Sequence, residues 1–324
     1  MEIKRVFFRK SLIQGLLLLI LILLATAPFY APEYTVILMT SIFMYIIMAV
    51  SWTLFSGPTG YISLAPAAFF GAGVYTSALL GFELPLPFVI GIGGLAGFGL
   101  ALLVGALTLR LRGIYFVMFT FGLVELLLHS VLWWEANITG TIGRVVPSVD
   151  NTTVYYLMLI IFAILMLTTY LIRHSKFGLA LQSIGEEEEA AAHTGINVMA
   201  LKIITFAVSA FFMGAAGAVM ATRWTYIDPK IAFNPFLSFM PVLMAIFGGM
   251  GRLYGPVIGA VIFTYLEEFL ITKFPYHYML IFGITMLVVI RFIPNGMEGV
   301  IQRWFRNDKK GSLEKEPDHL KLKL

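Results

Sequence analysis

Long apolar runs recur along nearly the whole chain and limit the folds that it can adopt. A helix needs about 20 apolar residues to cross a bilayer core of about 30 Å. By that measure we predict about ten spans: Ser11–Phe29, Tyr34–Phe55, Pro66–Leu80, Pro85–Leu109, Ile114–Trp134, Val154–Arg173, Ala200–Thr222, Phe236–Gly249, Tyr254–Ile271 and Tyr278–Ile293. The third and eighth are short and interrupted by glycine and proline. We therefore expect an all-α polytopic membrane protein of about ten transmembrane or re-entrant helices, with broken helices near its centre.

The composition agrees with a membrane protein and argues against several other classes. Hydrophobic residues make up 59% of the 324 positions and charged residues only 12%, whereas a soluble domain is about a quarter charged. Without cysteine, the chain has no disulfide, thiol nucleophile or cysteine-based metal site. It also lacks the phosphate-binding loop G-x-x-x-x-G-K-[ST], the zinc motif H-E-x-x-H and a nucleophile elbow. We predict a non-enzymatic membrane protein that holds no metal or cofactor of its own.

The positive charges predict how the chain is oriented. If the N-terminus lies in the cytoplasm, the outer connections hold only four of the 22 lysines and arginines: Arg144, Arg223, Lys230 and Lys273. Positive residues favour cytoplasmic loops, and an odd number of spans would remove this asymmetry. We therefore expect both termini in the cytoplasm. Because the basic residues flank apolar segments instead of forming one patch, we expect no binding to nucleic acid.

The two ends of the chain differ from its apolar body. Basic residues precede the apolar stretch Leu12–Leu24, which is followed by the small residues Ala25–Ala27, so a cleaved signal peptide is an alternative to a first membrane helix. Pro28, directly after that site, favours the helix. Near the other end the chain becomes highly charged. We predict a membrane domain over residues 1–302 and a disordered cytoplasmic tail over residues 303–324.

The longest predicted cytoplasmic connection, residues 174–199, carries a run of four glutamates followed by three alanines. This composition favours a short helix, because acidic residues are stabilising in a first helical turn. A glycine shortly after the run is typical of a helix end. The plain alternative is a solvated acidic turn between two membrane helices. The residues that we single out are Glu186, Glu187, Glu188, Glu189, Ala190, Ala191 and Gly195.

Two segments rich in glycine and proline, Ser56–Leu80 and Phe247–Ala260, interrupt the apolar pattern. Proline removes a backbone donor and glycine weakens a helix, so we expect no regular helix from Ser56 to Pro66. Irregular backbone at membrane depth is stable only where protein or a water-filled cavity satisfies it, and paired interruptions are typical of a transport path. Ordinary loops between closely packed helices are the alternative. The candidate path residues are Gly57, Pro58, Gly60, Ser63, Gly248, Gly249 and Gly251.

Glu125 is an ionisable residue inside a predicted span. It lies 12 residues beyond Gly113, which is roughly 18 Å along a helix, and His129 follows one turn later on the same face. Charge at this depth is costly and often functional, so Glu125 is a candidate for lining a polar path. The alternative, which we favour, is a hydrogen bond that joins two helices.

The acidic segment resembles a known functional element. Ser175–Val198 is similar to the cytoplasmic coupling loop of ABC-importer permeases, with Glu189, Ala190, Ala191 and Gly195 in the pattern E-A-A-x-x-x-G. In that family the short helix of this loop docks into a cleft of an ATP-binding subunit and carries its motion to the membrane. The resemblance implies the same role for the acidic segment.

A broader resemblance covers most of the chain. From Ala49 to Thr264 it is similar to the branched-chain amino acid permeases of ABC importers, in particular their LivM-like subunit. Both Gly/Pro-rich segments contribute to this likeness, as do Leu109–Leu127 and Leu201–Ala221. The pair Ala65-Pro66 departs from it, because relatives usually carry glycine and then a polar residue or histidine. Solute contacts of the family are therefore not carried over to this position.

The resemblance implies a permease subunit of the cell inner membrane that forms the path for leucine, isoleucine, valine and similar amino acids. It implies three kinds of partner: two ATPase subunits, a second and related permease subunit, and an external solute-binding protein. ATP and magnesium would then be bound by the ATPase subunits, which drive the transport.

Two other functions are open at this point. A permease of the same type for urea, short amides or simple sugars would have the same features, because the external binding protein largely selects the solute. An ion-driven secondary transporter would need acidic residues in the middle of the membrane, where Glu125 is the candidate, and it would not need the acidic loop.

Overall fold

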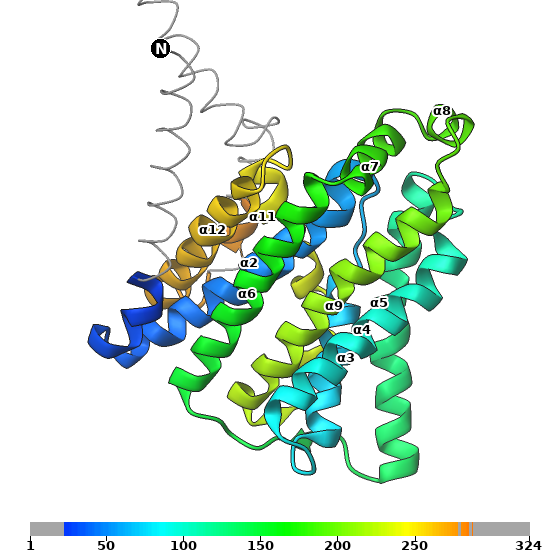
Figure 1. The fold of residues 1–324 in the computed structure, drawn as a ribbon. Coiled ribbons are helices and arrows are strands. Elements are labelled where there is room, and N and C mark those ends of the chain that lie inside the picture. Colours follow the sequence, from blue (N-terminus) through cyan, green and yellow to red (C-terminus); the bar gives the residue numbers. More distant parts are fainter. Residues whose placement is uncertain (1–22, 278–279, 285–286, 288–324) are drawn as a thin grey trace, which may run out of the picture.

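The computed structural model describes residues 23–277, 280–284 and 287, and these residues are mostly helical (Figure 1). Two short strands form an antiparallel ribbon. The elements are α2 (Glu33–Thr59), α3 (Pro66–Leu80), α4 (Leu86–Thr108), α5 (Ile114–Trp134), the π-helical turn η1 (Glu135–Thr139), β1 (Arg144–Val145), α6 (Asn151–Arg173), α7 (Lys176–Glu186), α8 (Glu188–His193), α9 (Val198–Trp224), β2 (Tyr226–Ile227), α10 (Pro229–Ala232), α11 (Phe236–Gly248) and α12 (Tyr254–Lys273).

The predicted spans between Tyr34 and Ile271 all coincide with described helices. Seven helical segments of the described chain are long and apolar enough to cross a membrane, and α3 is a shorter apolar helix. Most of the predicted spans Ser11–Phe29 and Tyr278–Ile293 lies outside the described residues, as do the tail 303–324 and most of the alternative signal peptide. The all-α membrane fold is therefore confirmed, whereas the total of ten spans and the cytoplasmic position of both termini stay predictions.

Helix α9 lies at the centre of the bundle and is the most completely buried of the candidate spans in the described chain. It packs against α3 and α4 and also against α2 and α6 (Figure 1). Glycine allows the close contact of α9 with α3 and α4, because a Cβ added at four positions of these helices would overlap a backbone carbonyl of a neighbouring helix. Small residues of this kind bring membrane helices into close contact. We call these four residues the glycine seam: Gly73, Gly97, Gly214 and Gly217.

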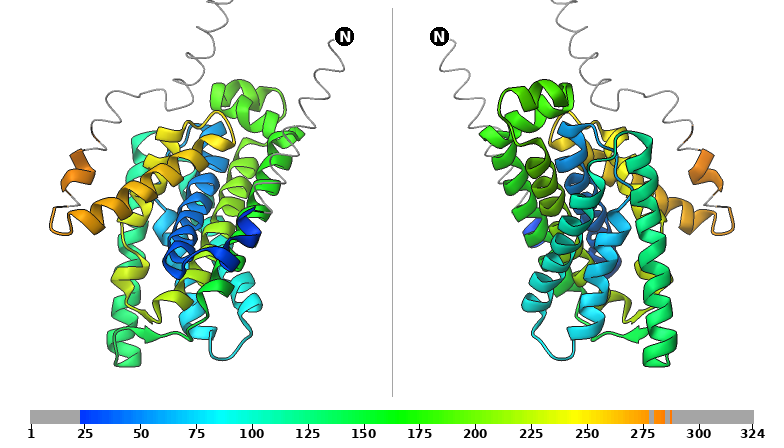
Figure 2. Two further views of the ribbon diagram at one scale, coloured as in Figure 1. Left: turned by 90° about the vertical axis from the view of Figure 1, so that its left-hand side faces the viewer. Right: turned by 90° about the vertical axis from the view of Figure 1, so that its right-hand side faces the viewer.

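The connections predicted to be cytoplasmic gather at one end of the bundle, which we call the loop end. It comprises α7 and α8, the turn between α4 and α5, and the turn between α11 and α12 (Figures 1 and 2). The opposite end contains the β1–β2 ribbon and the hairpin between α3 and α4. The connections thus alternate between the two ends, as successive membrane crossings require.

At the opposite end, a buried carboxylate holds the loop that follows α5. The fully buried Glu135 accepts hydrogen bonds from the Gly143 N–H (2.8 Å), from Arg144 Nε (3.2 Å) and from the Tyr75 hydroxyl (3.3 Å). Arg144 also lies over the Trp134 ring. The predicted span Ile114–Trp134 ends just before Glu135, but in the structure this residue continues the helix as η1 and turns inward to pair with Arg144.

Candidate functional site

Helix α7 lies against the loop end of the bundle and contacts α2 and α6. Its buried face consists of Gly178, Leu181 and Ile184. Gly185, in the last turn of α7, makes the closest contact with α2: a Cβ added there would overlap the Pro58 carbonyl near the end of α2. A displacement of α7 therefore acts directly on the end of α2, where the first Gly/Pro-rich segment begins.

The helix predicted over the glutamate run is divided in the structure. Helix α7 ends at Glu186, Glu187 is extended (φ −156°, ψ 109°), and α8 begins at Glu188. The predicted short helix is therefore confirmed from Glu188 onward and interrupted at Glu187, and this break turns Glu188 inward toward a buried cation. The predicted helix stop at Gly195 is confirmed, since Gly195 has a φ of +86° and its N–H donates to the Ala192 carbonyl (3.0 Å).

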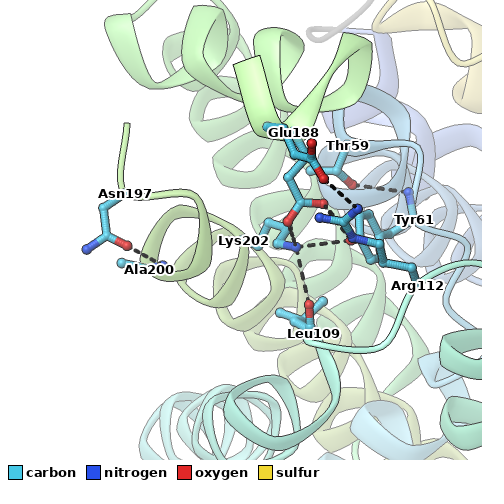
Figure 3. Close-up of polar contacts among 9 residues, drawn as sticks. Thr59, Tyr61, Leu109, Arg112, Glu188, Asn197, Ala200 and Lys202 are labelled. Atoms are coloured by element: carbon cyan, nitrogen blue, oxygen red, sulfur yellow. Dashed lines mark hydrogen bonds and ion pairs between the residues drawn. The ribbon is translucent and has the colours of Figure 1, made fainter. Parts of the chain in front are cut away.

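The buried cation is Lys202, in the first turns of α9 (Figure 3). Its side chain is 1% exposed. The ammonium donates to Glu188 Oε1 (2.7 Å), to the Tyr61 hydroxyl (3.1 Å) and to the Leu109 carbonyl (3.2 Å). Because an ammonium has three donors and no acceptor, every donor of Lys202 is paired. We call Lys202, Glu188, Tyr61 and the Leu109 carbonyl the Lys202 cluster.

The Lys202 cluster joins four parts of the chain. Glu188 belongs to α8, Tyr61 to the segment between α2 and α3, and Lys202 to α9. The Leu109 carbonyl lies at the C-terminal end of α4, where helix carbonyls lack partners within the helix. The Tyr61 hydroxyl also donates to Glu188 Oε2 (2.8 Å), and the Lys202 ammonium lies 4.4 Å from the centre of the Tyr61 ring. Three side chains thus tie the loop to the membrane helices.

Glu188 is ionised at neutral pH in this environment. Burial alone raises the pKa of its carboxyl, but hydrogen bonds from Lys202 and Tyr61 and the charges of Lys202 and Arg112 outweigh that effect and lower the pKa below its ordinary value of 4.5. Arg112 lies 3.8 Å from Glu188 and 3.7 Å from Glu189, and its side chain is mostly exposed. Exposed pairs of this kind contribute little, so the contact between Lys202 and Glu188 is the dominant one.

The remaining predicted coupling residues lie mainly on the surface of α8 and the turn after it. The Glu189 side chain is 76% exposed, and Ala190 and Gly195 are exposed as well. Ala191 is buried and faces the bundle together with Glu188. Helix α8 is therefore held by one side, while the other side is available for contact with another chain.

The first Gly/Pro-rich segment stays helical for longer than predicted. Helix α2 continues through Thr59, because Pro58 lies in its last turn and the Thr59 hydroxyl donates to the Phe55 carbonyl (2.6 Å). Gly60, with a φ of +72°, then ends the helix. The prediction of irregular backbone is wrong up to Thr59 and confirmed for residues 60–65.

Residues 60–65 run back into the bundle beside α2. The indole that contacts them belongs to Trp52, seven residues before the end of α2, which corresponds to a depth of roughly 10 Å. Non-helical backbone is stable at such a depth where protein satisfies it. Three hydrogen bonds do so around the start of α3: Trp52 Nε1 to the Ser63 carbonyl (2.8 Å), the Leu64 N–H to the Thr120 hydroxyl (3.0 Å), and the Ala67 N–H to the Ser238 hydroxyl (3.0 Å).

The two Gly/Pro-rich segments meet at the loop end. The end of α2, the ends of α6 and α7, and the turn after α11 surround a pocket of about 280 Å³, which Gly57, Pro58 and Gly251 help to line. Arg173 crosses this region and donates to the carbonyls of Met250 and Gly251 (both 3.2 Å). The structure thus brings together path candidates from both segments.

The second Gly/Pro-rich segment differs from the first, because it is a turn between two packed helices. Helix α11 ends at Gly248 and α12 begins at Tyr254. A Cβ added at Gly248 would overlap the Gly255 carbonyl, and Gly249 has a φ of +98° that favours glycine. These glycines therefore serve a tight turn and close packing, which is the alternative stated for this segment.

Glu125 lies on an exposed side of α5, which stands at the edge of the bundle (Figures 1 and 2). Its side chain is 40% exposed and lies 3.7 Å from His129, on the next turn of the same helix. Both residues line an open groove of about 760 Å³ along α5, together with Ser130 and Trp133. In the described part of the chain, this contact between Glu125 and His129 lies within α5 and does not join two helices.

Sequence reasoning misses Lys202 and Tyr61 as members of the site. The sequence contains one signal for the lysine: Lys202 is the single charged residue from Val198 to Thr222 in an otherwise apolar stretch. A cation in such a helix needs an acceptor, and the glutamate run precedes it in the chain. The tyrosine gives no comparable signal, because its role depends on the path of residues 60–65.

Known proteins of one transport family are similar to this chain over most of its length. The family described as "Branched-chain amino acid transport system / permease component" matches residues 34–290. The chain is 26% identical to the high-affinity branched-chain amino acid transport system permease protein LivM of Escherichia coli strain K12 and to that of Salmonella typhimurium, over 88% of this chain and 75% of each relative. It is 28% identical to the ribose import permease protein RbsC of Haemophilus influenzae, over 42% of this chain and 43% of the relative.

No solved structure matches the chain. The matched residues 34–290 cover most of its length, and the glycine seam, the Lys202 cluster and the acidic loop lie within that range. The described helices have the length and apolar composition of membrane spans. The chain therefore belongs to the family of permease components of branched-chain amino acid transport systems, and it is a multi-pass protein of the cell membrane.

Proposed function

We propose that this chain is one of two permease subunits of an ABC importer and forms part of the path for branched-chain amino acids. The observation that carries this proposal is the breadth of the similarity to the LivM proteins, which extends over 88% of the chain. Transport of a pentose sugar is the second candidate, favoured by the more local similarity to the ribose and xylose permeases. Permeases for urea and short amides would have the same general architecture, but no specific observation favours these solutes.

The surface of α8 supports a coupling role for residues 174–199. With the loop end in the cytoplasm, as Arg112, Arg173, Lys176 and Arg252 at that end indicate, the exposed side of α8 faces the ATPase subunits. Glu189 and Ala190 then contact an ATPase cleft. ATP and magnesium are bound by those partner chains, and this chain transmits the resulting movement.

The exposed side of α5 supports a shared path between two permease subunits. Glu125 lies about 16 Å along α5 from its start at Ile114, near the middle of a membrane crossing. Ionisable side chains at that depth face protein or water, because contact with lipid is costly. Glu125 and His129 therefore face the second permease subunit or the water-filled path beside it. Residues 60–65 lie against the other side of α5, which faces its own bundle and where Thr120 accepts a hydrogen bond from the Leu64 N–H.

The test is ATP-dependent uptake of labelled leucine into vesicles that contain this chain, the second permease subunit and the ATPase subunits, with the binding protein outside. We expect uptake that disappears when this chain is omitted and that isoleucine and valine inhibit, whereas ribose and urea do not. ATP-dependent uptake of ribose would keep the mechanism and contradict the amino acid assignment. Uptake by this chain alone, driven by an ion gradient, would contradict the whole proposal.

A further inference from the structure

The non-helical segment 60–65 is held at both of its ends by different parts of the molecule. At its beginning, Tyr61 is bonded to Glu188 of α8 and to Lys202 of α9. At its other end, side chains of α2, α5 and α11 bond the backbone around the start of α3. The segment is therefore bonded at Tyr61 to the loop outside the membrane helices, as Figure 3 shows, and its backbone is bonded a few residues later to side chains within the bundle.

We propose that Lys202 is a positioning residue of the transport cycle, which links α8 to segment 60–65 so that movement of the loop displaces that segment. This inference rests on the proposed function. Glu188 supplies the connection on the side of the loop, and Tyr61 supplies it on the side of the path. The Leu109 carbonyl holds the ammonium in place at the end of α4.

The chemistry of the contact favours transmission of movement over simple stabilisation. Burial of an ammonium is costly, and apolar side chains of similar volume often stabilise a protein as well or better. A fully paired ammonium has a property that apolar packing lacks, because its hydrogen bonds are directional. The same side chains can separate by rotation and meet again, so the contact can exist in two states of the loop.

The packing of Tyr61 extends the link toward α5. Its ring makes an edge contact with Phe116 of α5, with ring centres 5.5 Å apart, and it lies 6.5 Å from the ring of Phe55 of α2. Movement of the tyrosine therefore changes its packing against α2 and α5. Through Phe116, the link reaches the helix that carries Glu125.

The first part of the test uses the isolated chain. Because the sequence has no cysteine, a single Ile62→Cys substitution places one spin label in the segment, at a side chain that is 45% exposed. We expect Lys202→Met to increase the mobility of this label. Lys230→Met, a change of an exposed lysine near the opposite end, is the matched control and leaves the mobility unchanged. Equal mobility in the Lys202→Met and control proteins would overturn the link.

The second part measures leucine uptake and ATP hydrolysis in the assembled complex. We expect Lys202→Met to lower uptake at least about tenfold while ATP hydrolysis continues, so that the number of solutes moved per ATP falls. A merely structural role would lower assembly, hydrolysis and uptake together, and that result would contradict the proposal. Lys202→Arg keeps the charge and should restore part of the uptake.

Two further variants, Glu188→Gln and the double variant with Lys202→Met, distinguish loss of the link from a folding defect in Lys202→Met. Glu188→Gln keeps the shape of the side chain and removes its charge, and we expect it to lower uptake per ATP in the same way. Since both residues act in one link, the double variant should lose no more than Lys202→Met alone. Additive losses would contradict the link. A wild-type complex that moves no solute would instead contradict the proposed function.

Discussion

The glycine seam and the Lys202 cluster hold helices together in opposite ways. In the glycine seam the backbones of α3, α4 and α9 touch, and no side chain lies between them. In the Lys202 cluster, long side chains span the distance between α8, α9 and segment 60–65. A close-packed interface of backbones does not deform gradually, whereas hydrogen-bonded side chains can rotate and exchange partners. The comparison indicates a rigid core around α9 and a movable connection at the loop end.

The largest expected effect comes from a change in the glycine seam. Gly73→Ala places a Cβ onto the Gly214 carbonyl, and we expect the overpacking to lower the free energy of unfolding by about 1–3 kcal/mol or more. The measurement is the thermal midpoint of the purified chain in detergent. Gly99→Ala on α4 is the control: nothing lies within 4 Å of its added Cβ, so alanine there should be neutral or slightly stabilising. Equal midpoints for both variants would show that the seam is not tightly packed.

An intermediate effect is expected when acid breaks the Lys202 cluster. The pKa of Glu188 is lowered in the folded chain, so its contribution is complete above the ordinary value of 4.5 and is lost as the pH falls through the lowered value. A spin label at Thr194→Cys, just after α8, should therefore become more mobile below about pH 4.5. A label at Leu95→Cys, on the exposed side of α4, should not respond in this range.

The control for the acid experiment is Glu188→Gln, which cannot ionise. In this variant the Thr194 label should already be mobile at pH 7 and should stay so on acidification. If the mobility still changed below pH 4.5 in the Gln variant, another carboxyl would be responsible, and the pairing of Glu188 with Lys202 would not be what orders α8.

The smallest effect is expected on α5, which takes part in neither the glycine seam nor the Lys202 cluster. Glu125 is partly exposed and contacts His129 of its own helix, so Glu125→Gln keeps a polar side chain of the same size. We expect leucine uptake to stay above about half of the wild-type rate, because glutamine keeps the size and polarity of the side chain that faces the second subunit or the path. Loss of uptake with intact assembly would show that the path needs the charge of this carboxylate.

Much of the helical architecture follows from the apolar runs, because about 20 apolar residues have few alternatives in a bilayer. The spans between Tyr34 and Ile271 are therefore predictable, and so is the helix end at Gly195, where a positive φ suits glycine. The continuation of α2 to Thr59 is not, because Pro58 falls in the last turn, where the Thr59 hydroxyl bonds the Phe55 carbonyl and α7 packs against the Pro58 carbonyl. Residue preference alone disfavours a helix there.

The Lys202 cluster lies beyond sequence reasoning for a different reason. Its members are Tyr61, the Leu109 carbonyl, Glu188 and Lys202, which are widely separated in the chain and come together only in the folded bundle. The sequence indicates that the glutamate run matters, but it does not show that Glu188 turns inward and Glu189 outward. That distinction depends on the extended backbone of Glu187.

The side-chain bonds to the segment before α3 also affect how water enters the bundle. The N–H groups of Leu64 and Ala67 donate to the hydroxyls of Thr120 and Ser238. If the segment moves away from α5 and α11, these donors lose their partners, and a buried amide without an acceptor is costly. Water must then replace the hydroxyls, so opening of the bundle at this point and its hydration are one event.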